Sequence, residues 1–291
     1  MVAILNVSGI ISPTRLPEVT PEMKHSIWRF IDSGSLNAAQ NMALDEALLL
    51  QFQPESSLPV VRIYRWEPHA LSLGRFQDAA EVLNLDRCRC FNMPIVRRIS
   101  GGGTVYHAEE FSYSIICAPH HLPESTSIKQ AYRLLNSFLI AFYRNFGLDA
   151  DFSVNSVTDM NIPMHSPFCY AGRETFDILI GGRKIGGNAQ RRLRNVIFQH
   201  GSIPLLNRSQ EGVQFMKKPP PDFSRRVTSL ADEGVNLADD MLVYPLKQSL
   251  QSALCIELID SDPDEAELEY ADRLESDKYC RDMWNLHGTT S

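Results

Sequence analysis

At residues 97–107 the chain reads RRISGGGTVYH, with three consecutive glycines behind two arginines. Glycines lack a Cβ atom, so their main chain can approach a ligand closely and point successive N–H groups at a carbonyl or phosphate oxygen. Arg98 would add a planar, bidentate donor for an anion. The same letters also fit a glycine-rich turn with solvated arginines, and the stretch alone leaves both interpretations open. It matches neither a Walker loop nor a dinucleotide-binding fingerprint.

Strand and helix patterns on both sides of this glycine run predict the fold class. Strand-like residues 94–98 lead into the run and residues 111–118 follow it, which predicts a hairpin-like arrangement. The wider pattern predicts strands at 60–66, 70–74, 176–180, 183–186 and 196–206, and helices at 37–50, 127–146, 242–254 and 263–279. Pro245 fits the third of these helices only in its first turn. The order favours an α+β fold with a mixed or antiparallel central sheet flanked by helices.

Length and composition fit one large domain. The chain has 291 residues, of which 44% are apolar, and this is enough to bury a sizeable core. We expect residues 26–291 to form a single catalytic domain, with 222–291 as a helical C-terminal part packing on it. Residues 1–25 are expected to be a disordered extension, and Met23 leaves a misplaced start codon open. A net charge of -7 disfavours nucleic-acid binding, and no apolar run is long enough to predict a membrane span.

The six cysteines are scattered and lack a repeated CxxC spacing. This pattern predicts neither a metal site nor a disulfide framework, and it favours a reducing cytoplasm as the location of the protein. Cys169 follows a polar, proline-containing loop and lies near Arg173, a setting that favours the reactive thiolate. A lone cysteine is also compatible with an inert packed residue. The candidate bases for the Cys169 thiol are His107, His165 and His200. Each of them could equally be a core histidine.

A second glycine-rich segment, GRKIGGNAQ at residues 182–190, contains Lys184 among apolar and small residues. A lysine in this setting either extends its ammonium outward to solvent or serves an oxygen atom of a buried ligand. The pattern alone does not decide between the two.

Several separated motifs, in order, resemble the biotin/lipoate protein ligase superfamily. They are WRFIDSG at 28–34, NMALDEA at 41–47, the glycine run, the lysine segment, HGS at 200–202, and the ending from Lys278-Tyr279 to Trp284-Asn285. The similarity is to lipoate-protein ligases and to cysteine-dependent octanoyltransferases, and it covers almost the whole chain after Met23. It implies an α+β fold related to class II aminoacyl-tRNA synthetases and to biotin protein ligases. It also implies the attachment of an octanoyl or lipoyl group to a lysine of an acceptor protein.

The resemblance also implies roles for individual residues. Cys169 would be the nucleophile and Lys184 the group that contacts the acyl carbonyl or acyl-adenylate. The acyl- or adenylate-binding residues would be Arg98, Ser100, Gly101, Gly102, Gly103, Thr104, His107, Gly187, Asn188, Ala189 and His200. No metal ligand and no covalently bound cofactor are expected.

Two chemistries compete within the family. A transferase takes octanoate from acyl carrier protein through a cysteine thioester, whereas a ligase activates free lipoate with ATP and Mg²⁺. Cys169 stands fifteen residues before Lys184, and the chain ends soon after Trp284, which favours the transferase. The triple glycine looks more like the ligases, and Ala108 replaces an aspartate common to both groups. In either case the acceptor would be a lipoyl domain or the glycine-cleavage H protein. A non-catalytic acyl-binding relative is the third possibility.

Overall fold

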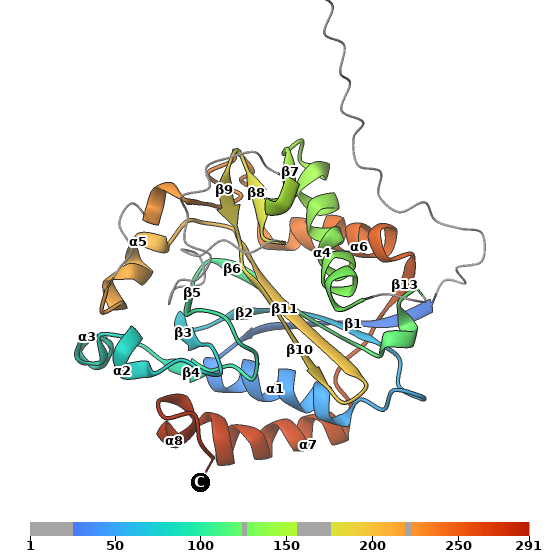
Figure 1. Cartoon of the computed structure of the whole chain (residues 1–291). Helices are drawn as coiled ribbons and strands as arrows, with labels where there is room; N and C mark the ends of the chain where they lie inside the picture. The colour runs from blue at the N-terminus through green and yellow to red at the C-terminus, as the bar shows by residue number, and fades with distance from the viewer. Residues whose placement is uncertain (1–25, 124–126, 156–175, 219–222, 291) are drawn as a thin grey trace, which may run out of the picture.

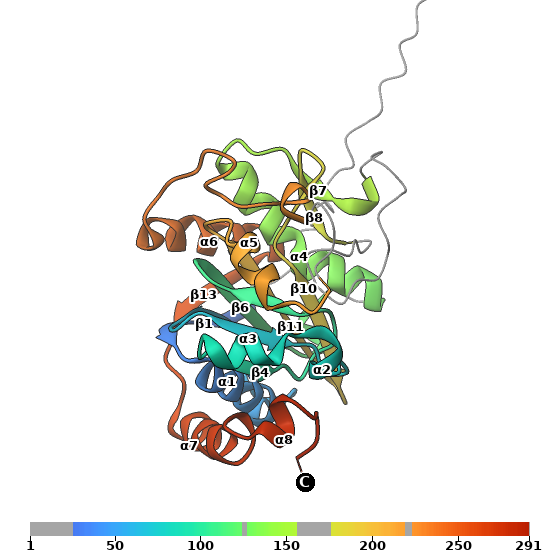
Figure 2. The same ribbon diagram turned by 90° about the vertical axis from the view of Figure 1, so that its left-hand side faces the viewer.

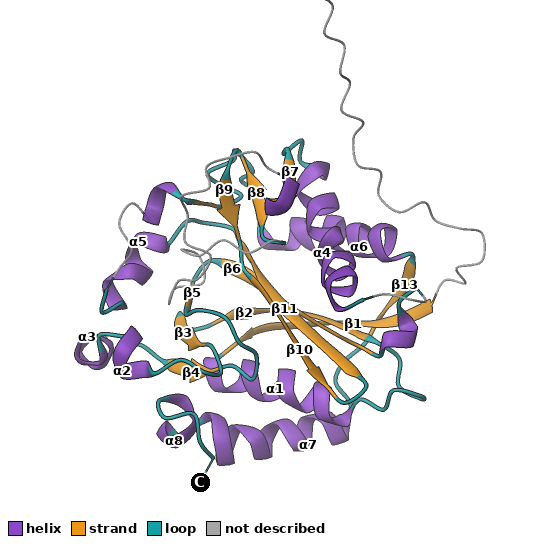
Figure 3. Cartoon of the chain, viewed as in Figure 1, coloured by secondary structure: helices purple, strands orange, loops and turns teal. Residues whose placement is uncertain are grey.

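The computed structural model describes residues 26–123, 127–155, 176–218 and 223–290. The expected N-terminal extension, His165, Cys169 and the triple proline at 219–221 lie outside the described residues. The structure is built on thirteen strands in its described part (Figure 3). They are β1 (Ser26–Leu36), β2 (Val60–Trp66), β3 (Ala70–Leu73), β4 (Ile95–Arg97), β5 (Val105–His107), β6 (Glu110–Cys117), β7 (Ala150–Phe152), β8 (Ile178–Ile180), β9 (Arg183–Ile185), β10 (Asn188–Leu193), β11 (Val196–Pro204), β12 (Val227–Thr228) and β13 (Ile256–Asp260).

The largest sheet has six strands in the order β10-β11-β6-β2-β1-β13. The strands from β10 to β2 pair antiparallel, while β1 pairs in parallel with both β2 and β13. The sheet is therefore mixed, and the predicted α+β class is confirmed. Two small sheets, β12-β9-β8-β7 and β4-β3-β5, carry the lysine segment and the start of the glycine run.

Helices cover both faces of the six-stranded sheet (Figures 1 and 2). On one face lie α4 and α6; on the other lies α1, with α7 packed beneath it as an outer layer. The α-helices are α1 (Ala38–Gln51), α2 (Ala79–Val82), α3 (Leu85–Cys90), α4 (Ile128–Asn145), α5 (Ser209–Gly212), α6 (Asp239–Leu254), α7 (Glu265–Leu274) and α8 (Asp282–Asn285). The part after residue 222 thus contributes three of these helices and also two strands, β12 and β13.

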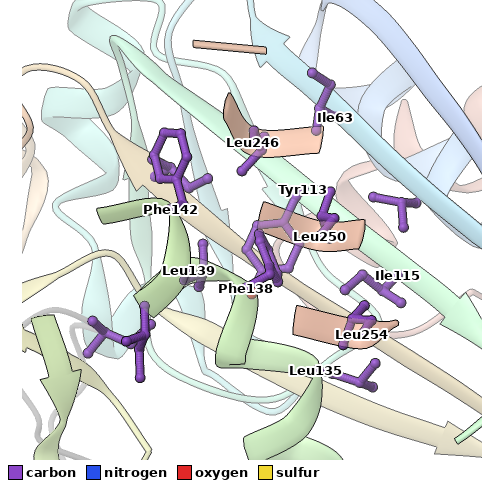
Figure 4. Packing of buried hydrophobic residues seen from close by; sticks show 14 of the residues in the cluster. Ile63, Tyr113, Ile115, Leu135, Phe138, Leu139, Phe142, Leu246, Leu250 and Leu254 are labelled. Carbon is purple, nitrogen blue, oxygen red and sulfur yellow. The ribbon is translucent and has the colours of Figure 1, made fainter. Parts of the chain in front are cut away.

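The main core lies between the sheet and the pair α4 and α6 (Figure 4). Helix α4 presents Leu135, Phe138 and Phe142 at helical spacing, and all three are fully buried against Ile115 and its neighbours on β6. Large apolar side chains at this spacing stabilise a fold by about 1.5–3 kcal/mol each when buried. The face of the sheet that α4 and α6 cover is therefore filled by core side chains, and its role is to stabilise the sheet.

Two local predictions were wrong. The glycine run does not connect the two strands of a hairpin, because β4 pairs in parallel with β3 while β6 belongs to the six-stranded sheet. An apolar alternation specifies a strand but not its partner, and the partner of β4 is a strand more than twenty residues earlier in the chain. Pro245 lies inside α6 and not in its first turn, because the helix begins at Asp239. Asp239 and Asp240 lie in that first turn, where their negative charges interact favourably with the helix dipole and stabilise a start before Leu242.

Candidate active site

Arg98, directly after β4, shapes the glycine run. Its Nη1 donates to the carbonyl and hydroxyl oxygens of Ser72, at 2.8 Å and 2.6 Å, and its Nη2 donates to the carbonyls of Gly101 and Gly103, at 3.2 Å and 2.8 Å. The residue is buried. The guanidinium expected to hold a substrate anion is thus committed to main-chain carbonyls of the loop that the anion would approach. Its contact with substrate stays a prediction.

His107, on β5, belongs to a buried chain of hydrogen bonds whose directions are fixed. Arg98 can only donate to Ser72 Oγ, so the Ser72 hydroxyl is free to donate to His107 Nε2, 2.6 Å away. His107 Nδ1 then donates to Glu110 Oε1 at 2.7 Å. The imidazole also stacks on Trp66, with 3.8 Å between ring centroids. Both ring nitrogens of His107 are thus engaged in hydrogen bonds with Ser72 and Glu110.

The environment of His107 keeps it neutral. Burial lowers its pKa, and the charge of Arg98 lowers it further, whereas Glu110 raises it and only partly compensates. His200, on β11, has a pKa well below its usual value because of burial, with Arg98 and His107 acting in the same direction. Two neutral imidazoles therefore line the interior beside the glycine run.

His200 connects β11 to the glycine run. Its Nε2 lies 2.5 Å from Ser100 Oγ, one residue before the three glycines. Arg191, on the neighbouring strand β10, donates from Nη1 to the carbonyl of Ile99 at 2.8 Å. The hairpin of β10 and β11 thus holds the glycine run from a second side. Thr104, at the far end of the run, is buried and donates from Oγ1 to Gln77 Oε1 at 3.1 Å.

Lys184, in the middle of β9, forms an ion pair with Asp177. Its Nζ lies 2.8 Å from Asp177 Oδ2, and the two side chains are only 6% and 3% exposed. The backbone N–H of Lys184 donates to the carbonyl of Arg226 at 2.8 Å, which fixes the strand. Lys184 thus points inward and does not extend its ammonium to solvent, whereas its contact with an oxygen atom of a ligand stays a prediction.

The turn after Lys184 packs tightly on β11. Gly186 has a φ of +77°, and a Cβ atom on it would lie 2.1 Å from the carbonyl oxygen of Ser202. Gly187 and Ser202 exchange hydrogen bonds, with 3.0 Å from Ser202 N to Gly187 O and 3.3 Å from Gly187 N to Ser202 Oγ. Only a residue without a side chain allows this approach at Gly186.

β10 continues this contact toward the glycine run. Ala189 is the register partner of His200, and Asn188 is the register partner of Gly201. Asn188 Oδ1 accepts from the Tyr113 hydroxyl at 2.7 Å, which anchors the start of β10 to β6. Because His200 also reaches the glycine run, the two segments singled out in the sequence meet across β11.

The cysteines divide by environment. Burial raises the pKa of Cys88 to about 11 and that of Cys117 to about 12, so both thiols stay protonated at neutral pH. The pKa of Cys280 is also raised, first by burial and then by Glu275. A thiolate is the attacking form in acyl transfer, so these three are poor nucleophiles. Cys169 and His165 lie outside the described residues.

Among the residues that the structure describes, no group of three or more His, Cys, Asp or Glu side chains could hold a metal ion. Within the same residues, no helix has the length and hydropathy needed to cross a membrane.

The model of the lipoyl protein ligase A/B catalytic domain matches residues 37–251. The chain belongs to this family. It is 35% identical over 273 residues to octanoyltransferase LipM of Lysinibacillus sphaericus (strain C3-41), covering 89% of this chain and 98% of that protein. It is 31% identical to octanoyltransferase LipM of Bacillus subtilis (strain 168), covering 90% and 99%. The predicted family and the predicted enzyme of lipoate or octanoate attachment are confirmed.

Solved structures of lipoyl protein ligases share the fold. A lipoate-protein ligase A bound with ATP superimposes with a TM-score of 0.76 at 24% identity, over 90% of this chain and 99% of that chain. A bi-partite lipoate protein ligase from Thermoplasma acidophilum, from a study that includes its E2 lipoyl domain, gives 0.75 at 22% identity, over 91% and 98%. At these identities the likeness establishes the architecture alone.

The sequence analysis missed three polar residues of the candidate site: Asp177, Glu110 and Ser72. Asp177 could have been noticed as a carboxylate at the edge of an apolar strand, seven residues before Lys184. Glu110 opens β6 three residues after His107, a spacing that permits their contact but does not require it. Ser72 gave no signal, because a serine inside Ala-Leu-Ser-Leu looks like any strand residue.

Proposed function

We propose that this chain is a protein octanoyltransferase that carries its acyl group on Cys169 and delivers it to a lysine of an acceptor protein. One observation carries the choice: relatives named octanoyltransferase share 31–35% identity with it over nearly their whole length. The solved lipoate-protein ligases are more distant, at 22–24% identity.

The reaction has two balanced steps. The Cys169 thiolate attacks the thioester carbonyl of octanoyl-acyl carrier protein; a new thioester forms, and the carrier leaves as its thiolate. The neutral ε-amine of the acceptor lysine then attacks this thioester; an amide forms, the Cys169 thiolate leaves, and it takes up the proton that the amine loses. The donor is already activated, so ATP is not consumed. A reducing cytoplasm suits a free thiol of this kind.

Lys184 and the glycine run act on the carbonyl. Both steps place negative charge on the acyl oxygen, and donors aimed at that oxygen typically contribute about 3–4 kcal/mol each. The Lys184 ammonium, oriented by Asp177, and the N–H groups at Gly101 to Gly103 would be these donors, and the contact of His200 with Ser100 beside the glycine run supports this role. The acyl chain adds about 0.8 kcal/mol per buried CH₂, which gives an apolar slot its preference for chain length.

The acceptor is a lipoyl domain or the glycine-cleavage H protein. Support comes from the family and from the T. acidophilum ligase, which was studied with an E2 lipoyl domain. Acyl carrier protein as the donor follows from the thioester chemistry.

An ATP-dependent lipoate-protein ligase is the second candidate. The triple glycine and the fold shared with a ligase bound with ATP favour it. In that case the same Lys184 and glycine run would hold an acyl-adenylate, with ATP and Mg²⁺ as co-substrates. A non-catalytic acyl-binding relative would bind octanoate tightly and turn over no acceptor.

Intact mass spectrometry separates these candidates. Purified protein is incubated with octanoyl-acyl carrier protein without ATP, beside a Cys169→Ala variant and a matched Cys280→Ala control. We expect one octanoyl adduct on the natural chain and on the control, and none on Cys169→Ala. Absence of the adduct, together with ATP-dependent lipoylation by Cys169→Ala, would replace the transferase by the ligase.

A further inference from the structure

Arg97 is the last residue of β4, and its side chain contacts both the turn at residues 74–77 and the C-terminal segment. Its side chain is buried, and it donates from Nε to the carbonyl of Trp284 and from Nη2 to the carbonyl of Leu286, both at 2.9 Å. Its Nη1 faces the carbonyls of Gly74, Arg75 and Gln77, at 3.1, 3.2 and 2.6 Å. Arg97 therefore ties the C-terminal segment to the turn at residues 74–77.

The same C-terminal segment completes the open edge of β4. Within the described part of the chain, β4 has one strand neighbour in its sheet, β3. On the main chain of Arg97, the N–H donates to Asn285 Oδ1 at 3.1 Å and the carbonyl accepts from Trp284 Nε1 at 2.9 Å. Two side chains of α8 thus take the place of a neighbouring strand at the last residue of β4, and Figures 1 and 2 both show α8 against β4.

The turn at residues 74–77 is in direct contact with the glycine run. The N–H of Arg75 donates to the carbonyl of Ser100 at 2.7 Å. A Cβ atom on Gly74 would lie 2.0 Å from the carbonyl oxygen of Gly102, so the two main chains are in contact. Displacement of this turn would displace the glycines.

The C-terminal segment is itself fixed to the body of the protein. Lys278 Nζ and the Tyr279 hydroxyl bind the carboxylate of Glu46 on α1, at 2.6 Å and 2.7 Å. Asn285 Nδ2 donates to the carbonyl of Tyr279 at 2.6 Å. Residues 278–288 all lie beyond residue 251, where the match to the catalytic-domain family ends.

We propose that the C-terminal segment at residues 279–288 positions the active site through the side chains of Trp284 and Asn285. Through Arg97 and the turn at 74–77 they fix the glycine run, and so they set the rate of acyl transfer without touching the acceptor. Trp284 and Asn285 are the positioning residues. The inference deepens the proposed function and rests on it for its kinetic readout only.

The test compares Asn285→Ala with Met283→Ala in the full chain. Met283 is on the same helix but is 48% exposed, and it makes none of the contacts with Arg97 described above. For Asn285→Ala we expect amide hydrogen exchange at residues 99–104 to accelerate at least tenfold while β6 and β11 keep their protection. We expect kcat for octanoyl transfer to fall on the order of tenfold, as for a misplaced catalytic loop, with KM for the acceptor unchanged. Met283→Ala should match the natural chain in every measurement.

Unchanged exchange at residues 99–104 in a folded Asn285→Ala chain would overturn the proposal, as would a loss of kcat that equals the unfolded fraction. If Asn285→Ala does not fold, Arg97→Lys gives the same test, because an ammonium cannot serve the five carbonyls that Arg97 faces. Should the natural chain transfer no octanoate, the proposed function fails, and the exchange data alone still decide the role of the C-terminal segment.

Discussion

The two glycine-rich segments look alike in the sequence, yet they use their buried cations differently. Around the glycine run, Arg98 donates to four main-chain and hydroxyl oxygens. In the lysine segment, Lys184 forms an ion pair with a buried carboxylate, Asp177. A guanidinium that donates to several carbonyls shapes a loop, whereas an ammonium paired with a buried carboxylate is held in one orientation. From this difference we expect Arg98 to support the loop and Lys184 to act in the chemistry, and the variants below test both expectations.

The largest effect is expected from separating Lys184 from Asp177. Lys184→Met leaves a buried carboxylate without its partner, which should cost about 3–5 kcal/mol of unfolding free energy. The double variant Lys184→Met/Asp177→Asn should recover most of that stability, measured by urea unfolding. Acyl transfer should stay at least about 100-fold below the natural rate in both, because the oxyanion donor is gone. A double variant that regains both stability and activity would reduce Lys184 to a structural residue.

A smaller loss should follow from separating the lysine turn from β11. Gly186→Ala meets the Ser202 carbonyl and a left-handed φ, and overpacking with backbone strain should cost about 2–4 kcal/mol. Gly181→Ala is the matched control: its φ is +55°, but its Cβ would meet nothing, so about 1 kcal/mol is expected. Thermal unfolding of both variants checks the difference. Equal losses would show that φ alone matters and that the contact with β11 does not.

Arg98→Lys tests the shaping role directly. The charge is kept, but at most three donors replace the guanidinium fork, so we expect a loss of about 1–3 kcal/mol. Activity should fall together with the protection of Gly101 to Gly103 from hydrogen exchange. If Arg98 instead held a substrate anion as a point charge, lysine would keep the stability and change only the KM for the acyl donor.

The smallest effect is a dependence on pH. The pKa values of His107 and His200 are lowered in the folded state, so below about pH 6.5 the unfolded chain binds protons that the folded chain does not. Stability is therefore complete above pH 6.5 and falls as the pH drops toward the folded pKa values, by up to about 1.4 kcal/mol per pH unit for each histidine. Urea unfolding at pH 7 and pH 5.5 measures this. His200→Gln should flatten the slope, and an unchanged slope would contradict its burial as a neutral ring.

The sequence predicted the parts of the site that carry a local signature. The glycine run and Lys184 stand out because few residue types allow close backbone approach or buried charge, whereas His200-Gly201-Ser202 was noted through the resemblance to the family. Contacts between distant segments could not be found this way. Arg97 meets Trp284 187 residues later, and Asp177 meets Lys184 only through the register of β8 and β9. β13 was missed for a related reason: four of its five residues are exposed or partly so, and its pairing with β1 decides that it is a strand.

The most direct test of the account is a crystal structure of the chain with octanoate or a non-hydrolysable octanoyl amide. We predict that the carbonyl oxygen lies within hydrogen-bonding distance of Lys184 Nζ and beside Gly101 to Gly103, with the alkyl chain running into the apolar interior. An acyl group bound elsewhere, with Lys184 and the glycine run both uncovered, would contradict it.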